Sequence, residues 1–159
     1  MSAPQPRAAI DGAKPRIEYR QFQLVDQEDN LQLPQGWARS SRIVIPAGPG
    51  ALLRTGGNDF YPLVRLEAWL AEPDPQDLWE AVEEADFRTG TGTVCLREWD
   101  GGPVGHPLPV GEPGSYRLRA YCRGRAEAEA LVGHELYYEG VEEWLLQVWA
   151  VSTEPLRVR

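Results

Sequence analysis

Residues 142–151 read EEWLLQVWAV and carry apolar side chains on both faces of an extended segment. A strand of this kind is buried on both sides, which predicts a central place in a sheet or a place beneath another layer. Residues 62–70 (PLVRLEAWL) and 115–123 (SYRLRAYCR) instead alternate apolar with mixed or polar side chains. Alternation with a period of two is typical of strands that bury one face. Together the three segments predict a core built from sheets.

Turn residues divide the rest of the chain into short elements. The 159 residues include 16 Gly and 14 Pro, well above average use. Further strands are expected at 16–26, 42–45, 51–54, 91–99 and 106–110, with a bulge near Arg20 in the first. Residues 1–15 are expected to form a flexible tail, and Trp37 to anchor a polar stretch in the core. We therefore predict a mainly β protein, an antiparallel β-sandwich, as one domain over residues 16–159.

One substantial helix is expected, at residues 75–87. Asp74 could cap it, Pro75 would occupy its first position, and Asp77 lies where a capping box places its acid. Apolar residues recur at spacings of three and four, as on one helix face: Leu78, Ala81, Val82 and Ala85.

The charge balance restricts the partners. Asp and Glu number 24 against 16 Lys and Arg, giving a formal net charge of −8. Such a chain is poorly suited to bind nucleic acid directly, because affinity for phosphate comes from clustered Lys and Arg side chains. The sequence has no run of 18 apolar residues, so no membrane span is expected. It also shows no apolar leader, and a cytoplasmic location is therefore expected.

No pattern indicates catalysis, a metal site or a cofactor. His106 and His134 are the only histidines, and neither has a partner at a diagnostic spacing. Cys95 and Cys122 each alternate with apolar residues, which indicates packed thiols. We expect a protein that is not an enzyme, has no cofactor and binds no metal.

The strongest pattern is two acidic blocks, at residues 72–86 and 126–143, which hold seven and six acids and lack Lys and Arg. Such blocks could dock a basic protein, with tyrosines in the second block as buried anchors. Candidate partner-binding residues are Asp77, Glu80, Glu83, Glu84, Glu135, Tyr137, Tyr138, Glu139 and Glu142.

The two acidic blocks could also exist without a partner. They could be solvated faces, and the second could be a loop packed on its own domain. Arg117, Arg119 and Arg123 share one strand face and are expected to pair with nearby acids. A rival function is a sandwich that binds a sugar or lipid through exposed aromatics, with candidates Trp69, Trp99, Tyr121 and Trp149.

The order of elements resembles the ComJ-like proteins. The resemblance is carried by Tyr19-x-x-Phe22, Gly114-x-Tyr116-x-Leu118 and the strand with Trp144 and Trp149. It implies a compact β-sandwich that inhibits a DNA-entry nuclease, with related bacterial proteins that resemble immunity partners for toxins. We therefore expect an inhibitor or immunity protein for a basic nuclease or toxin, with the partner's identity and the oligomeric state left open.

Overall fold

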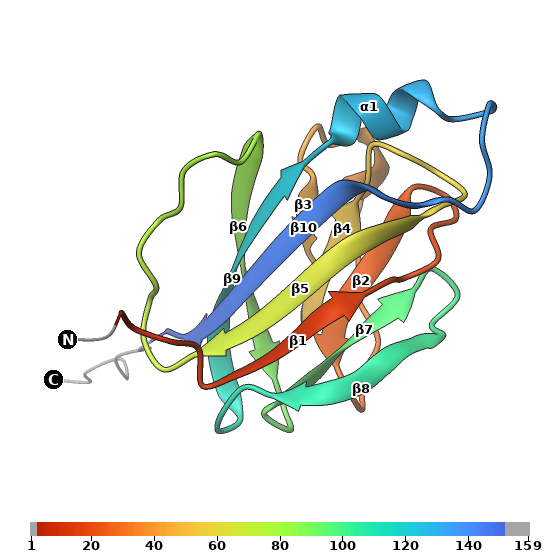
Figure 1. Cartoon of the computed structure of the whole chain (residues 1–159). Coiled ribbons are helices and arrows are strands. Elements are labelled where there is room, and N and C mark those ends of the chain that lie inside the picture. Colours follow the sequence, from red (N-terminus) through yellow and green to blue (C-terminus); the bar gives the residue numbers. More distant parts are fainter. Residues whose placement is uncertain (1–2, 152–159) are drawn as a thin grey trace, which may run out of the picture.

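Two five-stranded sheets pack face to face in the computed structural model, which describes residues 3–151 (Figure 1). The first sheet has the order β1-β5-β10-β9-β6 and the second the order β3-β4-β2-β7-β8. The first sheet consists of β1 (Ala8–Ala13), β5 (Tyr61–Trp69), β10 (Glu139–Ala150), β9 (Gly114–Arg123) and β6 (Ala81–Thr89). The second consists of β3 (Val44–Pro46), β4 (Gly50–Arg54), β2 (Gln21–Asp26), β7 (Thr93–Glu98) and β8 (Pro103–Pro109). The predicted β-sandwich is confirmed.

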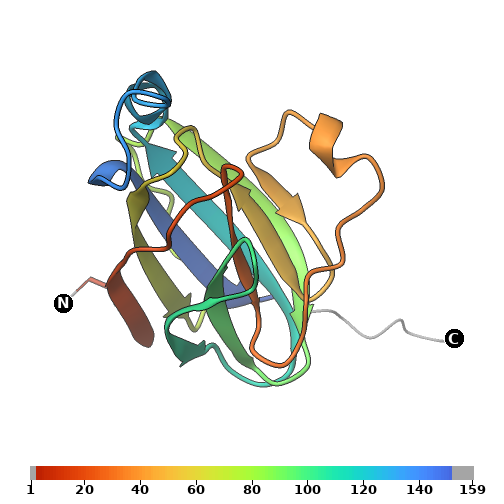
Figure 2. The same cartoon turned by 90° about the vertical axis from the view of Figure 1, so that its right-hand side faces the viewer.

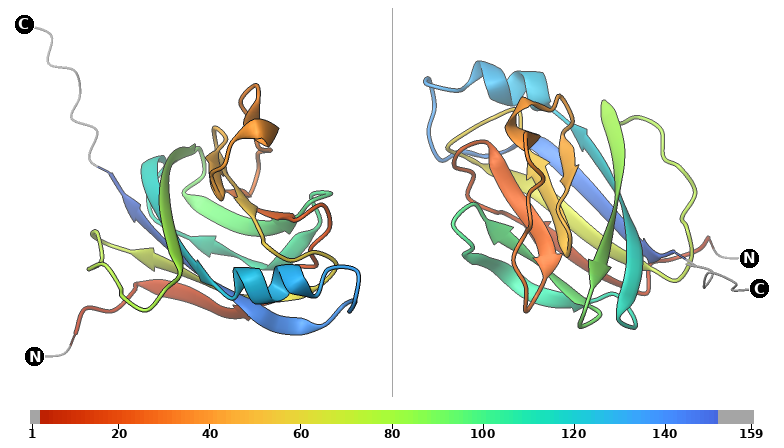
Figure 3. Two further views of the ribbon diagram at one scale, coloured as in Figure 1. Left: turned by 90° about the horizontal axis from the view of Figure 1, so that it is seen from above. Right: turned by 180° about the vertical axis from the view of Figure 1, so that it is seen from behind.

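The strand β10 occupies the centre of the first sheet, as its two apolar faces predicted. It pairs antiparallel with β9 and parallel with β5, so the sandwich is mostly rather than wholly antiparallel. Trp144, Leu146 and Val148 point into the core between the sheets, where the Trp144 ring meets Phe22 of β2 edge to face at 5.4 Å. Figure 3 shows the two sheets as layers, with the helix α1 (Arg125–Ala130) across one end.

The helix predicted at residues 75–87 is wrong. Residues 71–80 are irregular, and 81–89 form the edge strand β6, paired antiparallel with β9. Ala81 and Ala85 are four residues apart and therefore fit a strand period as well as a helix period. Pairing also sets Glu84 opposite Arg119 and Asp86 opposite Arg117, which a helix would forgo. The helix of the described chain is α1, inside the second acidic block.

The tail predicted over residues 1–15 is wrong for residues 8–13. These residues form β1, which extends the first sheet beyond β5 and places Ile10 opposite Leu66. Ile10 and Ala13 are buried, so this strand contributes to the core. The segment was hard to recognise because it has one large apolar residue.

Two local expectations also need correction. The first predicted strand begins at Gln21 instead of residue 16, because Tyr19 and Arg20 adopt left-handed φ angles of 56° and form a turn where a bulge was expected. Trp37 is not in the core: it lies in a 3-10 turn, η1 (Trp37–Arg39), on a segment that projects from the sandwich (Figure 2).

Candidate functional site

The first acidic block is mostly bound to its own domain. The segment 71–80 runs along the outer face of the first sheet, where Arg119 donates to the Pro73 carbonyl at 3.0 Å and to Glu72 at 2.6 Å. The Tyr121 hydroxyl accepts from the Gln76 backbone N–H at 3.0 Å. Glu80 is exposed, but its carboxylate accepts the backbone N–H of Gly124 at 2.9 Å.

Glu83 and Glu84 serve the fold instead of forming a free acidic surface. The Oε1 atom of Glu83 accepts the backbone N–H groups of Ile43 and Val44, each at 2.9 Å, so this side chain connects β6 to β3 in the other sheet. Glu84 accepts from Arg119 at 2.7 Å. Asp77 is exposed and makes no hydrogen bond or salt bridge to a described residue, so it is the candidate of this block that stays free.

Glu142 was predicted at a partner-binding surface, and this prediction is wrong. Its side chain is fully buried. One carboxylate oxygen accepts the N–H groups of Gly56 and Gly57 at 2.9 and 3.1 Å, and the other accepts the indole N–H of Trp144 at 2.8 Å. Burial raises the pKa of Glu142, and the hydrogen bonds and the Arg125 charge only partly oppose that rise. Through these hydrogen bonds, Glu142 connects the start of β10 to the turn after β4.

Tyr138 also packs on its own domain. Its ring stacks on Phe60 at 5.2 Å between centroids, and its hydroxyl donates to the Ala128 carbonyl at 3.3 Å. Burial raises the pKa of this hydroxyl. Of the candidate residues in the second block, Glu135, Tyr137 and Glu139 are therefore the exposed ones, and Glu139 pairs with Lys14.

Exposed aromatic and apolar side chains gather where four turns meet at one end of the sandwich. We name this surface the aromatic end and define it by Tyr19, Trp99, Leu136 and Tyr137, which are 69%, 39%, 62% and 54% exposed. The turns bond to each other: Tyr137 donates its N–H to the Asp59 carbonyl at 2.7 Å, and Asp59 to the Ile17 carbonyl at 2.9 Å. In Figure 1 they lie beside the start of β5, opposite the chain termini.

The backbone at this end is held in an uncommon conformation. Four residues here have φ between 51° and 58°, a region that residues other than glycine seldom occupy: Tyr19, Arg20, Asp59 and Tyr137. The Tyr19 and Trp99 rings meet at 4.6 Å, and the Trp99 indole N–H donates to Glu18 at 2.7 Å. Sequence reasoning missed Tyr19 and Trp99 as parts of this surface, because the contact joins segments about 80 residues apart.

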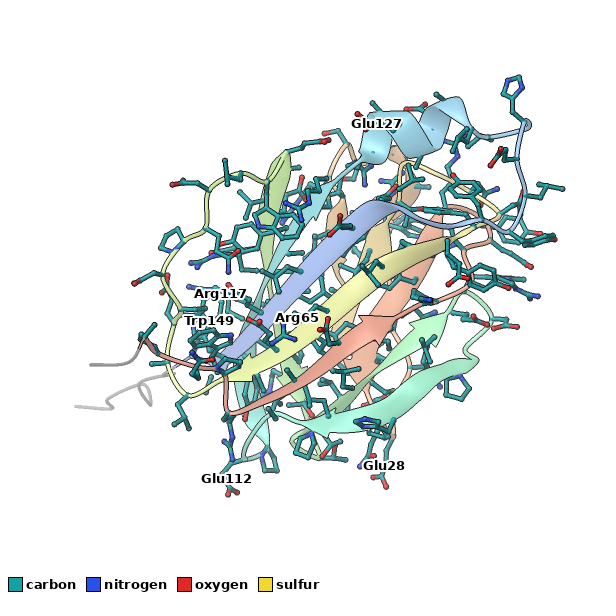
Figure 4. All side chains as sticks on the ribbon, in the orientation of Figure 1. Glu28, Arg65, Glu112, Arg117, Glu127 and Trp149 are labelled. Atoms are coloured by element: carbon teal, nitrogen blue, oxygen red, sulfur yellow. The ribbon has the colours of Figure 1, made fainter. Side chains whose placement is uncertain are left out.

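The aromatic residues proposed for a sugar or lipid site do not all lie together. Trp69, Tyr121 and Trp149 lie on the outer face of the first sheet, where Figure 4 labels Trp149, but Trp99 belongs to the aromatic end. Tyr121 and Trp149 are buried, and the Arg119 guanidinium lies 4.9 Å from the Trp149 ring centroid. As expected, the three strand arginines pair with acids: Arg117 with Asp86, Arg119 with Glu84 and Glu72, and Arg123 with Glu143.

The cysteine and histidine side chains, which could act as nucleophiles, general bases or metal ligands, do not form a common site. Cys95 and Cys122 are buried free thiols, and burial raises the pKa of both, that of Cys122 to about 11. His106 and His134 are exposed on loops or an edge strand. Residues 3–151 contain no group of three or more His, Cys, Asp or Glu side chains placed to hold a metal ion, and no helix long and apolar enough to cross a membrane.

The fold and these surfaces define a class: a ten-stranded, mostly antiparallel β-sandwich whose exposed aromatics lie on turns at one end. No family model and no curated protein matches the chain. Among solved structures, ComJ from Bacillus subtilis, an inhibitor of the DNA-degrading activity of NucA, matches with a TM-score of 0.60 and 12% identity over 94% of this chain and 100% of ComJ. The protein described as crocagin biosynthetic gene J matches with a TM-score of 0.57 and 17% identity over 91% and 99% of the two chains. The chain therefore has a ComJ-like fold.

Proposed function

We propose that this chain is a non-enzymatic inhibitor that docks on a basic nuclease through its aromatic end. The observation that carries the proposal is the set of exposed rings on interlocked turns. The ComJ-like fold supports it, because ComJ inhibits a nuclease. The inhibitor would act by covering the DNA-binding surface of the enzyme.

Rigid exposed rings suit a docking role. Tyrosine and tryptophan offer large contact areas and have few rotatable bonds, and they are enriched among the residues that dominate binding energy. Hydrogen bonds between the turns hold Tyr19 and Tyr137 in their present backbone conformation before any partner arrives. Less ordering is then needed on binding, which favours affinity.

Charge would select the partner. The turns of the aromatic end carry Asp59, Asp100 and Glu135, which form no salt bridge within residues 3–151, whereas Glu18 and Glu139 there pair with Arg16 and Lys14. The whole chain has a net charge of −8. A negative surface accelerates the approach of a cationic protein and repels DNA. A nuclease needs a basic surface to hold its substrate, so the same charges that attract DNA would attract this chain.

The test measures association and dissociation with a basic nuclease, sought first among the products of the neighbouring genes, for wild type and Tyr137→Ala. We expect dissociation to accelerate about 30-fold, which corresponds to the loss of about 2 kcal/mol at a binding hot spot. The matched control is Leu78→Ala, which truncates a side chain that is 90% exposed and lies in the first acidic block. Its rates should stay within about twofold of wild type.

Charge is tested separately with Glu135→Gln. Association should slow modestly at low salt and match wild type at high salt, because exposed charges are screened. If Tyr137→Ala binds like wild type while Leu78→Ala or Asp77→Asn is impaired, the aromatic end is not the interface. Absence of binding to the nuclease contradicts the proposed function itself.

A further inference from the structure

A cavity of about 410 Å³ opens between the projecting segment with η1, the end of β4 and the start of α1. Four arginines line it: Arg20, Arg42, Arg54 and Arg125. No Asp or Glu lines it, although acids outnumber bases by 24 to 16 in the whole chain. The cavity is therefore positively charged within an acidic protein.

Backbone carbonyls position these guanidinium groups. Arg54 donates to the Ser40 carbonyl at 2.6 Å, Arg125 to the Arg54 carbonyl at 2.5 Å, and Arg20 to the Gly56 carbonyl at 3.2 Å. A carbonyl fixes the direction of a guanidinium group without cancelling its charge. Arg54 makes no salt bridge within residues 3–151.

Each of the other three arginines has a carboxylate nearby, but at a longer distance than in a close ion pair. Glu83 lies 3.5 Å from Arg42, Glu129 3.8 Å from Arg20, and buried Glu142 3.9 Å from Arg125. Strong pairs on the first sheet are much closer, as at 2.7 Å between Arg117 and Asp86. The cavity thus retains positive charge that its neighbours neutralise weakly.

The other lining groups fit an anion that carries a ring. Ser40, Ser41 and Tyr19 can each donate a hydroxyl hydrogen bond. The Trp37 ring, 5.9 Å from the Arg54 guanidinium carbon, offers an apolar face beside the charges. Guanidinium groups match the oxygen geometry of phosphate and can bind it through two parallel hydrogen bonds.

We propose that this cavity binds the phosphate group of an organic phosphomonoester, with a planar group such as a nucleobase against Trp37. Its volume lies in the range of small-molecule sites. The phosphate could belong to a free mononucleotide or to the terminal phosphate of a DNA fragment, and the chemistry of recognition is the same. The cavity adjoins the aromatic end, because Tyr19 belongs to both, but Trp99, Leu136 and Tyr137 do not line it.

Isothermal titration calorimetry of the whole chain with AMP provides the test. We expect saturable binding at low salt with a Kd between about 10 µM and 1 mM, weakening as salt rises. Adenosine should bind at least tenfold more weakly, because it lacks the phosphate. A 5′-phosphorylated dinucleotide, compared with AMP, distinguishes a DNA end from a free nucleotide. Affinity should also increase from pH 5 to pH 7 as the phosphate loses its second proton near pH 6.

Variants locate the site. Arg54→Gln should weaken AMP binding about tenfold, and Arg54→Lys less, since lysine keeps the charge but lacks the planar fork. Arg42→Gln gives a second lining position if Arg54→Gln fails to fold. The matched control is Arg88→Gln, an exposed arginine outside the cavity that donates to Ser115, and it should bind like wild type.

Three results would overturn the proposal: no saturable binding of AMP up to about 10 mM, tighter binding of citrate than of AMP, or equal losses in Arg42→Gln and Arg88→Gln. The experiment contains no nuclease. Its failure would leave the proposed inhibitor function standing, and failure of nuclease docking would leave this site standing.

Discussion

Replacing Glu142 should reveal a structural carboxylate. In Glu142→Ala, the N–H groups of Gly56 and Gly57 and the indole N–H of Trp144 lose their acceptor inside the protein. Unpaired buried donors cost about 1–3 kcal/mol each, and relaxation recovers part of this. We expect the free energy of unfolding to fall by about 3–5 kcal/mol, a large share of the 5–15 kcal/mol typical of a domain.

Urea unfolding followed by fluorescence measures this loss. Glu142→Gln should cost less, about 1–2 kcal/mol, because one side-chain oxygen can still accept the two glycine N–H groups. The matched control is Glu143→Ala: this neighbour is about 41% exposed and pairs with Arg123 at 3.1 Å, so its loss should cost less than about 1 kcal/mol. A Glu142→Ala protein within about 1 kcal/mol of wild type would refute the structural role.

The raised pKa of Glu142 adds a pH test. Because burial places the folded-state pKa above the unfolded value, the native state holds the proton more strongly. The corresponding stability is fully present below the unfolded pKa and is lost as pH rises through the folded pKa. Wild type should therefore gain stability relative to Glu142→Gln as pH is lowered from 7 to 4; an unchanged difference would contradict the direction of the shift.

Three further predictions address other parts of the fold. Burial raises the pKa of Asp26, but hydrogen bonds from Thr89, Thr91 and the Glu28 N–H outweigh it and lower the pKa to about 2. Asp26→Asn should therefore cost about 1–3 kcal/mol at pH 7, and the deficit should shrink as pH falls from 4 towards 2; a deficit independent of pH would argue against it. Gly124→Ala should destabilise by at least about 2 kcal/mol in urea, since φ is 81° and the new Cβ would lie 1.9 Å from the Val141 oxygen; a silent change would contradict that geometry. Cys95→Ala should leave the rates of nuclease docking unchanged, because this buried thiol faces the Val25 carbonyl inside the second sheet, and altered rates would implicate the thiol.

The strands could be predicted where the sequence shows a clear period. Residues 62–70, 115–123 and 142–151 alternate or are apolar throughout, and each became a strand within one to three residues of its expected bounds. The helix prediction for residues 75–87 failed because Ala81 and Ala85 fit the period of a helix and that of a strand equally well. Only the pairing of Glu84 and Asp86 with arginines of β9 decides for the strand. β1 is an edge strand with little apolar surface, and its partner β5 lies about 55 residues away.

The candidate site was harder to predict, because acidity alone does not separate free from structural carboxylates. Asp77 and Glu135 are exposed, whereas Glu83 and Glu142 accept backbone N–H groups from segments about 40 and 86 residues away. Such long-range acceptors carry no local signature. The same limit applies to the arginine-lined cavity, which brings together residues 20, 42, 54 and 125.

The most direct test of the proposed inhibitor is the degradation of DNA by the nuclease that the chain binds in the docking experiment, titrated with the purified chain. We predict that cleavage falls to background near one chain per nuclease, and that Tyr137→Ala requires a higher concentration for the same inhibition while Leu78→Ala does not. Undiminished cleavage at a large molar excess of folded wild-type chain would contradict the proposed function.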